Sequence, residues 1–340
     1  VLSSGMTRYN VLLGAVIITV SLYLVQLLVY GLTRLKKRSH ALTYGPSMLL
    51  LAMITAVEVT DDGSLSAGFS WWLPVILLPL WLLMVGVARM VQDVEDDRSF
   101  GLLSRPMWIN VLMMALMIMG VTWVANTDAV FHYRMYAERC LVEGDADGAL
   151  SIGKRSLESD EHLLMLRMYA LARKGELGES LFEYPITGTS RQMLPTDSLS
   201  TLLVYPADSL YKFLGARPAA KMSPMKYLSL VQRRDTIYNK VVDDYLLCGY
   251  LIDKKLDQFA AEVGRYYQVN DSLPRHYREA LTLYTHLRAH PIVVYHSTVM
   301  DEDYDNLQEL KRQYPNRAEQ RQKIMESTYK QTYWYYYEYE

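Results

Sequence analysis

The histidines near the C-terminus are the first residues whose types and spacing suit chemistry. His286 and His290 lie four positions apart, so on a helix both imidazoles would face one metal ion. His276 with Glu279, and His296, lie close by in the sequence. A zinc site needs three or four convergent ligands, and neither an HExxH motif nor a cysteine pair accompanies these histidines. We therefore expect no metal centre here, and capping or surface roles for the histidines.

Cys140 and Cys248 are the two cysteines of the chain, and both fall on apolar faces of expected helices. An extracytoplasmic compartment would permit a disulfide between them. Free cysteine, however, packs as a small hydrophobic residue. The sequence favours two buried free thiols and leaves the disulfide open.

Motifs that mark common enzyme classes are absent from the sequence. No GxxxxGK[ST], GxGxxG or GxSxG motif occurs, so a phosphate-binding loop, a dinucleotide fold and a nucleophile elbow are not indicated. Runs of acidic residues occur at Glu95-Asp96-Asp97 and at Asp243-Asp244. We interpret both as solvated faces. The sequence thus predicts no catalytic residue and no cofactor, and it favours a role other than catalysis.

An unusually aromatic segment lies close to the last residue of the chain. It consists of Tyr333, Trp334, Tyr335, Tyr336 and Tyr337. Tyrosine and tryptophan offer contact area at low entropic cost, so the segment is our candidate binding site for a partner or a sugar. Alternatively, it packs into the last helical groove or lies at a membrane surface. The 27 tyrosines of the whole chain favour the packing alternative slightly.

The first third of the chain has the composition of a membrane protein. Four apolar segments without charged residues predict transmembrane helices at about 9–33, 41–57, 68–88 and 107–127. The segment 41–57 is the shortest and contains Pro46, so a re-entrant segment is its alternative. Because ionisable residues mark ion pathways, the uncharged spans argue against a transporter. We assign 1–127 to a transmembrane domain.

Loop charges predict the orientation of these spans. Arg34, Lys36, Lys37 and Arg38 follow the first span, and Arg89, Arg98 and Arg105 lie between the third and fourth. The loop after the second span contains acidic residues and neither lysine nor arginine. Lysine and arginine collect in cytoplasmic loops, so both ends of the domain would be extracytoplasmic. This orientation requires that 41–57 spans the membrane. We therefore expect a multi-pass protein of a bacterial inner membrane, in contact with membrane lipid, with a periplasmic C-terminal domain.

Residues 128–340 have the pattern of an all-α domain made of helical hairpins. Gly144 and Gly175 lie 31 residues apart at expected helix turns, and Ala149 stands five residues after the first. This spacing is close to that of tetratricopeptide arrays, although Ser180 fits less well. We expect an irregular break at 186–224, a final helix at 317–333 and no convincing strand pair. The near-neutral net charge of −2 gives no nucleic-acid footprint.

Three parts of this region carry a resemblance to a known group of proteins. They are DYLLCGYLIDKKLDQF (residues 244–259), NDSLPRHYREALTLY (residues 270–284) and the tyrosine-rich end. With the preceding spans, the chain resembles an uncharacterised Bacteroidota family of polytopic inner-membrane proteins with a tetratricopeptide-like helical C-terminal domain. The resemblance implies a location and a fold, and it implies no activity.

Two hypotheses of function follow. The first is a membrane-anchored scaffold whose extracytoplasmic helical-repeat domain binds a periplasmic protein or envelope component. The alternative is the C-terminal part of a polytopic glycosyltransferase-like enzyme that uses lipid-linked sugars. Such enzymes usually place catalytic acids in an early extracytoplasmic loop, and here only Glu58, Asp61 and Asp62 qualify. Because the chain begins at Val1, the sequence leaves open whether a longer protein precedes it.

Overall fold

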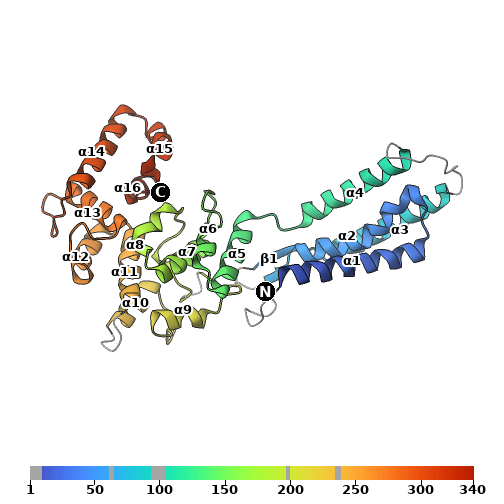
Figure 1. The fold of residues 1–340 in the computed structure, drawn as a ribbon, viewed down its shortest axis with the longest axis horizontal. Coiled ribbons are helices and arrows are strands. Elements are labelled where there is room, and N and C mark those ends of the chain that lie inside the picture. Colours follow the sequence, from blue (N-terminus) through green and yellow to red (C-terminus); the bar gives the residue numbers. More distant parts are fainter. Residues whose placement is uncertain (1–9, 61–64, 93–103, 197–199, 234–238) are drawn as a thin grey trace. The chain divides into compact units, whose positions relative to one another are not determined.

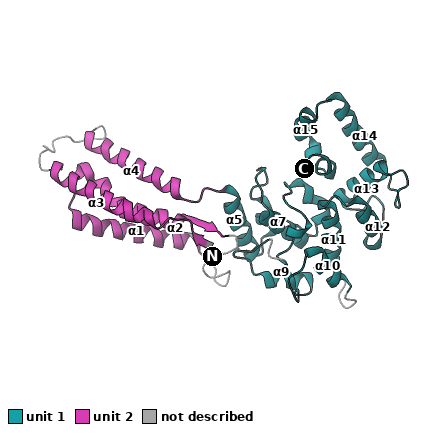
Figure 2. Cartoon of the chain, turned by 180° about the vertical axis from the view of Figure 1, so that it is seen from behind, with its two compact units in different colours: residues 1–6, 129–340 teal, residues 7–128 magenta. Residues whose placement is uncertain are grey.

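The structure is a computed structural model that describes residues 10–60, 65–92, 104–196, 200–233 and 239–340. In these residues helices dominate, and one pair of three-residue strands is the exception. The prediction of an all-α chain is confirmed. The chain separates into two compact units, residues 7–128 and a helical unit containing residues 129–340 (Figure 2).

Three helices of the first unit are long and apolar enough to cross a membrane. They are α1 (Val11–Thr33), α3 (Trp72–Gln92) and α4 (Arg105–Val124). Most of their large apolar side chains are exposed. Soluble monomers rarely expose such extended apolar surface, so lipid is the solvent that suits these helices. The chain therefore has the character of a membrane protein.

The second predicted span does not form one long helix, so the structure has three long apolar helices where four were expected. A 3-10 helix η1 (Lys37–Tyr44) is followed directly by α2 (Gly45–Thr55). Pro46 lies in the first turn of α2, where its missing amide costs no hydrogen bond, so the α-helix begins there. The 11 residues of α2 rise about 16 Å, roughly half the thickness of a hydrocarbon core.

A short β-hairpin follows α2, where no strand pair was expected. Strand β1 (Val57–Val59) pairs antiparallel with β2 (Leu65–Ala67), with Glu58 opposite Ser66. The alternation of valine and glutamate in β1 and the Asp62-Gly63 dipeptide after it are hairpin signals in the sequence. The apolar pattern of the neighbouring spans obscures them.

The helical unit consists of short helices joined by tight turns (Figure 1). Its elements are α5 (Ala129–Glu143), α6 (Ala146–Ser151), α7 (Glu161–Lys174), α8 (Leu177–Ser180), η2 (Leu181–Glu183), η3 (Ser190–Gln192), α9 (Ala207–Leu214), α10 (Pro224–Gln232), α11 (Lys240–Ile252), α12 (Leu256–Tyr266), α13 (Arg275–Leu287), α14 (Thr298–Gln313), α15 (Arg317–Met325), η4 (Thr328–Gln331) and α16 (Tyr333–Tyr339).

The same turn closes three helical hairpins: α5–α6, α7–α8 and α11–α12. Gly144, Gly175 and Lys254 occupy the turn with φ of 82°, 74° and 58°. In each, the amide of this residue bonds to the carbonyl three positions earlier, and the next amide bonds to the carbonyl five positions before it. This is the Schellman arrangement, which satisfies the last carbonyls of the first helix.

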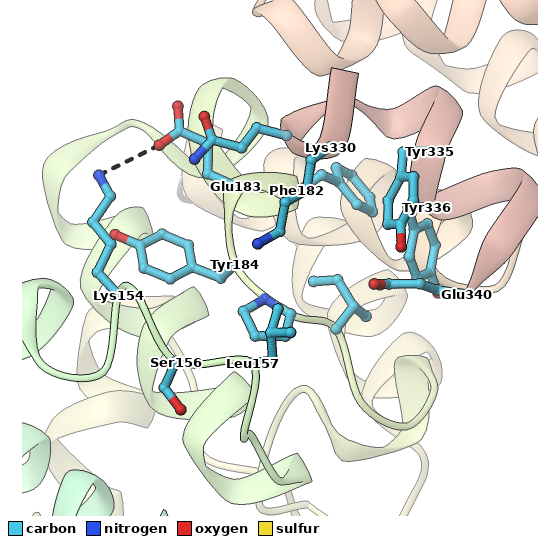
Figure 3. A pocket seen from close by; sticks show the side chains of 13 residues that line it. Lys154, Ser156, Leu157, Phe182, Glu183, Tyr184, Lys330, Tyr335, Tyr336 and Glu340 are labelled. Carbon is cyan, nitrogen blue, oxygen red and sulfur yellow. Dashed lines mark ion pairs between the residues drawn. The ribbon is translucent and has the colours of Figure 1, made fainter. Parts of the chain in front are cut away.

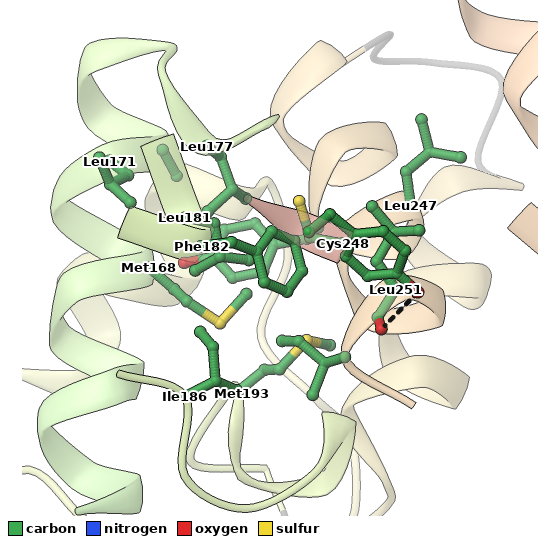
Figure 4. Close-up of a cluster of buried hydrophobic side chains, with 14 of the residues drawn as sticks. Met168, Leu171, Leu177, Leu181, Phe182, Ile186, Met193, Leu247, Cys248 and Leu251 are labelled. Atoms are coloured by element: carbon green, nitrogen blue, oxygen red, sulfur yellow. Dashed lines mark hydrogen bonds between the residues drawn. The ribbon is translucent and has the colours of Figure 1, made fainter. Parts of the chain in front are cut away.

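Helices α7 and α11 supply much of the core of the helical unit. Their buried side chains meet those of α8 and η2, as Figure 4 shows for Met168, Leu181 and Leu247 among others. Gly178 in α8 permits a close approach, because a Cβ there would lie 2.6 Å from the ring of Tyr277 on α13. The core thus joins segments that are distant in sequence.

The predicted final helix at 317–333 is broken into three pieces. Helix α15 ends at Met325, and η4 and α16 follow. The side chain of Ser327 accepts the amide of Tyr329, and that of Thr332 accepts the amide of Tyr335. Each of these caps begins a new helical segment, because it satisfies an amide that the preceding turn leaves unpaired.

Candidate functional site

The aromatic segment at the C-terminal end forms most of α16 and lies largely inside the helical unit. Tyr333, Trp334, Tyr335 and Tyr336 are buried, with at most 6% of each residue exposed, and Tyr337 is half-buried. Helix α16 packs against α13. A binding role for these five residues stays a prediction. In this conformation only a small part of their surface is accessible to a partner.

Polar atoms of α16 tie it to two other helices. Tyr336 donates its hydroxyl to the carbonyl of Ile252 at 2.7 Å, and Tyr333 donates to the carbonyl of Leu251 at 3.3 Å. Both carbonyls belong to the last turn of α11, and that of Leu251 also accepts the backbone amide of Lys254 at 3.0 Å. The indole Nε1 of Trp334 donates to the carbonyl of Glu279 at 2.7 Å. The aromatic segment therefore caps one helix and clamps another.

Beneath α16 lies a histidine–carboxylate pair that resembles part of a catalytic triad. His276 Nδ1 lies 2.9 Å from Glu279 Oε2, and both side chains are buried. His276 Nε2, however, accepts the backbone amide of Phe182 at 3.2 Å. Both ring nitrogens thus have partners within the helical unit, and Nε2 is already engaged by a backbone amide. This pair is structural.

A small pocket lies between α16 and the segment that follows η2. Figure 3 shows Lys154, Tyr184, Lys330, Tyr335 and Glu340 around it. Its volume is about 50 Å³, far below the roughly 300–1,000 Å³ of small-molecule sites. The pocket holds at most a small group, so it does not support an enzyme active site.

Burial shifts the pKa values of charged groups in and near this pocket. Burial raises the pKa of the Glu340 carboxyl, against the opposing influence of Arg321, Lys254 and Lys330. Burial also lowers the pKa of Lys254, whose ammonium lies 5.1 Å from the ring centre of Tyr336. Lys254 is the residue in the left-handed turn position of the α11–α12 hairpin, so the turn directs this cation onto the aromatic segment.

A larger groove runs along α14, and we call it the α14 groove. Its volume is about 860 Å³. It is lined mainly by polar side chains of α14 and by one side chain of α13, including His286, Tyr304, Asp305, Gln308, Glu309 and Arg312. In this lining the rings of His286 and Tyr304 pack at 4.6 Å between their centres, with Tyr304 buried and His286 exposed. Both signs of charge are exposed along it.

His286 and His290, whose four-residue spacing suits a metal ion on a helix, do not share a helix in the structure. Helix α13 ends at Leu287, so His286 lies on the helix and His290 beyond it. His286 Nδ1 contacts the carbonyl of Thr282 at 2.8 Å, and His296 Nδ1 lies 3.3 Å from Asp301. Within the described residues, no three metal-ligating side chains converge.

Buried acids are the functional-looking residues that sequence reasoning missed. The Asp243-Asp244 pair, expected on a solvated face, is almost fully buried. Asp244 Oδ1 accepts the hydroxyls of Tyr267 at 2.6 Å and of Tyr277 at 3.0 Å, and Tyr277 also contacts the thiol of Cys248 at 3.5 Å. Burial raises the pKa of Asp244 despite these donors. In the sequence, only Tyr267 and Tyr277 could have indicated that Asp244 is buried, and both lie more than 20 residues from it.

The remaining sequence candidates are separate from one another. Cys140 and Cys248 are free, buried thiols. Glu58 is exposed on β1. Asp61 and Asp62, and the run Glu95-Asp96-Asp97, lie outside the described residues.

In comparisons with known proteins, residues 227–340 match a family of unknown function, DUF6057. No curated protein and no solved structure matches the chain. The matched region begins within α10 and runs through α16. It therefore contains the aromatic segment and the α14 groove, and it contains no part of the membrane unit.

Proposed function

We propose that this chain is a membrane-anchored scaffold whose helical unit binds a protein or envelope component through the α14 groove. The observation that supports it best is the groove itself. Its volume is large enough for a peptide segment, but its lining is polar and charged. Small-molecule sites are mostly apolar, whereas the rim of a protein–protein interface is polar and solvent-accessible, as this lining is.

The repeated turn supports a hairpin-repeat architecture of tetratricopeptide-like kind. Each hairpin leaves one apolar face that the next must cover, and α11, α12, α13 and α14 contact each other in chain order. Arrays of this kind present extended helix faces to partners. The proposal takes the α14 groove as such a face.

A cross-linking experiment tests the binding proposal in the full-length protein. A photoreactive amino acid replaces Glu309 inside the groove, and a matched variant carries it at Asp303, which is exposed on α14 outside the groove. We expect a discrete protein adduct from position 309 in cells and none from position 303. Arg312→Glu in the same chain should abolish the adduct, because it reverses a charge in the groove.

Two results would count against the scaffold. Equal labelling from both positions would mean that the adduct reflects chance collisions. No adduct, together with a co-purified polyprenyl-phosphate sugar, would favour the glycosyltransferase-like alternative. Both outcomes are read from the mass spectrum of the purified chain.

We also propose that residues 37–57 make a fourth, composite crossing, so that the helical unit is periplasmic in a bacterial inner membrane. Asn110 near the start of α4 donates to the carbonyl of Lys37, and Asn126 just after α4 bonds to the carbonyls of Thr55 and Val57. The segment therefore accompanies α4 over its length. Asn110 and Asn126 are 16 residues apart, so the segment follows α4 for about 24 Å, most of the roughly 30 Å hydrocarbon core.

Cysteine labelling separates this topology from a three-crossing one. With the composite crossing, Lys36→Cys is cytoplasmic and Ser70→Cys is periplasmic, as the basic residues around position 36 favour. An impermeant maleimide should then label Ser70→Cys in intact spheroplasts and Lys36→Cys only after lysis. With three crossings, both positions lie on one side and react alike, which would overturn the topology.

A further inference from the structure

A groove with both polar and apolar walls lies in the membrane unit, between the end of α1, η1 and the first half of α4. We call it the lysine groove, and its volume is about 790 Å³. Lys36, Lys37 and His40 line its polar part, and Met107, Val111 and Met114 of α4 line its apolar part. The two chemistries sit in one continuous cavity.

The lysine groove is fixed by hydrogen bonds that join its two sides. Asn110 Oδ1 accepts the amide of Ala41 at 2.7 Å, and its Nδ2 donates to the carbonyl of Lys37 at 2.5 Å. One side chain of α4 thus satisfies backbone groups at both ends of the first turn of η1. Leu35, which also lines the groove, is 2% exposed and packs with Leu42 and Val85. The lysines are therefore carried on a segment docked to α4.

Aromatic rings complete the polar part. The ring of His40 lies edge-on to Tyr30 at 5.2 Å and to Tyr44 at 6.1 Å. Tyrosines at this depth suit the boundary between headgroups and acyl chains, where one end of the ring is wet and the other apolar. The lining of the groove thus combines cationic, aromatic and apolar side chains.

We propose that the lysine groove binds one anionic glycerophospholipid. Its phosphate and anionic headgroup lie against Lys36 and Lys37, and an acyl chain follows Val111 and Met114 along α4. Basic pockets between membrane helices select anionic headgroups in this way, because each lysine attracts the negative charge of the headgroup. In a zwitterionic lipid the positive group of the headgroup largely cancels this attraction. Arg34 and Arg38 flank the two lysines in the sequence and favour the same sign of ligand.

The test is a lipid titration of the purified full-length chain in detergent, with bound lipids counted by native mass spectrometry. Phosphatidylglycerol and phosphatidylcholine with identical acyl chains are the probes. We expect one phosphatidylglycerol molecule bound at least tenfold more tightly than phosphatidylcholine. Lys37→Gln should lower this affinity about fivefold, and the Lys36→Gln/Lys37→Gln double variant about 30-fold, at a contribution of about fivefold per lysine.

Two matched variants separate a built site from general attraction. Arg105→Gln removes one charge at the exposed start of α4 outside the groove and should leave the affinity unchanged within about twofold, below the fivefold factor for a lysine in contact with the lipid. Val111→Trp keeps every charge but fills the apolar wall, and it should expel the lipid. The native mass spectrum of each variant also reports whether the chain remains intact and monodisperse.

Three outcomes would overturn the proposal. Equal affinity for the two lipids would remove the selectivity, and an equal loss in Arg105→Gln and Lys37→Gln would reduce it to diffuse electrostatics. Competition by glycerol 3-phosphate as strong as that by phosphatidylglycerol would show a free phosphate site instead of a lipid site.

Discussion

Arg134 and Glu138 form an ion pair, with Nε 3.4 Å from Oε1, in which both side chains are almost completely buried. Glu138 also accepts the backbone amides of Leu203 and Tyr205, at distances between 2.8 and 3.0 Å. Arg134 donates to the carbonyl of Thr201. One turn of α5 therefore holds the irregular segment after residue 200 by charge and by hydrogen bonds.

This pair gives the first prediction. Glu138→Ala should lower the free energy of unfolding by about 3–5 kcal/mol, because it leaves Arg134 as an uncompensated buried charge. Glu143→Ala is the matched control on the same helix, since it breaks the exposed pair with Arg139 and should cost no more than about 0.5 kcal/mol. Chemical denaturation of the full chain in detergent, followed by circular dichroism, measures both. Equal effects would contradict the assignment of Glu138 as an anchor.

The second prediction concerns the aromatic segment. Trp334→Ala should destabilise the helical unit by about 3–5 kcal/mol, as expected for removal of a buried aromatic side chain. Tyr336→Phe should cost only about 1 kcal/mol, because it removes one hydrogen bond, to the carbonyl of Ile252, and keeps the ring. Thermal unfolding measures the order of the two variants. A Trp334→Ala chain as stable as the wild type would mean that α16 is not part of the core.

The third prediction is a pH dependence set by Asp244. Burial raises its pKa in the folded chain above the unfolded value, so the folded state binds the proton more tightly. The stability that this group contributes is present below its unfolded pKa and is lost as the pH rises through the folded pKa. Asp244→Asn should remove that decline, whose slope for one proton is at most about 1.4 kcal/mol per pH unit. Denaturation midpoints from pH 4 to 8 compare the two chains.

The amide of Asp244→Asn keeps an oxygen that can accept from Tyr267 and Tyr277, so the variant changes the charge more than the contacts. Parallel pH profiles for wild type and variant would show that another group causes the decline.

The fourth prediction concerns the repeated turn. Gly175→Ala should destabilise the chain by about 1–2 kcal/mol, because a φ of 74° brings a Cβ too close to the following carbonyl. Gly264→Ala, at an exposed helical position of α12 with open space around it, should instead stabilise by about 0.5–1 kcal/mol. Opposite signs in the same denaturation assay would confirm the conformational origin, and equal signs would exclude it.

Local features of the fold were predictable from the sequence, and features that depend on distant partners were not. Uncharged runs of about 20 residues identified α1, α3 and α4, because the bilayer sets that length. The turns at Gly144 and Gly175 were recognisable because glycine tolerates a positive φ. A turn at Lys254-Lys255 is also predicted by the sequence, where one apolar helical stripe ends and the next begins, but its left-handed φ is not, since lysine gives no such indication.

The candidate site shows the same division. The aromatic segment stood out by composition, but its partners lie far away in the sequence, with Glu279 and Ile252 preceding it by more than 50 residues. Asp244 looked like a surface acid because its tyrosine donors are on later segments. The polar lining of the α14 groove gave no indication in the sequence, because an ordinary solvated helix has the same composition.

The position of the aromatic segment close to the last residue of the chain has a consequence for biosynthesis. A nascent chain emerges from the ribosome in order, so α11 and α13 are exposed well before the rings that cover them exist. The hydroxyl that bonds to the Ile252 carbonyl belongs to Tyr336, which is translated 84 residues later, roughly 4–16 seconds at 5–20 residues per second. Over that interval the half-built unit presents apolar surface to its surroundings. Chaperone protection during synthesis is therefore most needed while residues 260–332 are being translated.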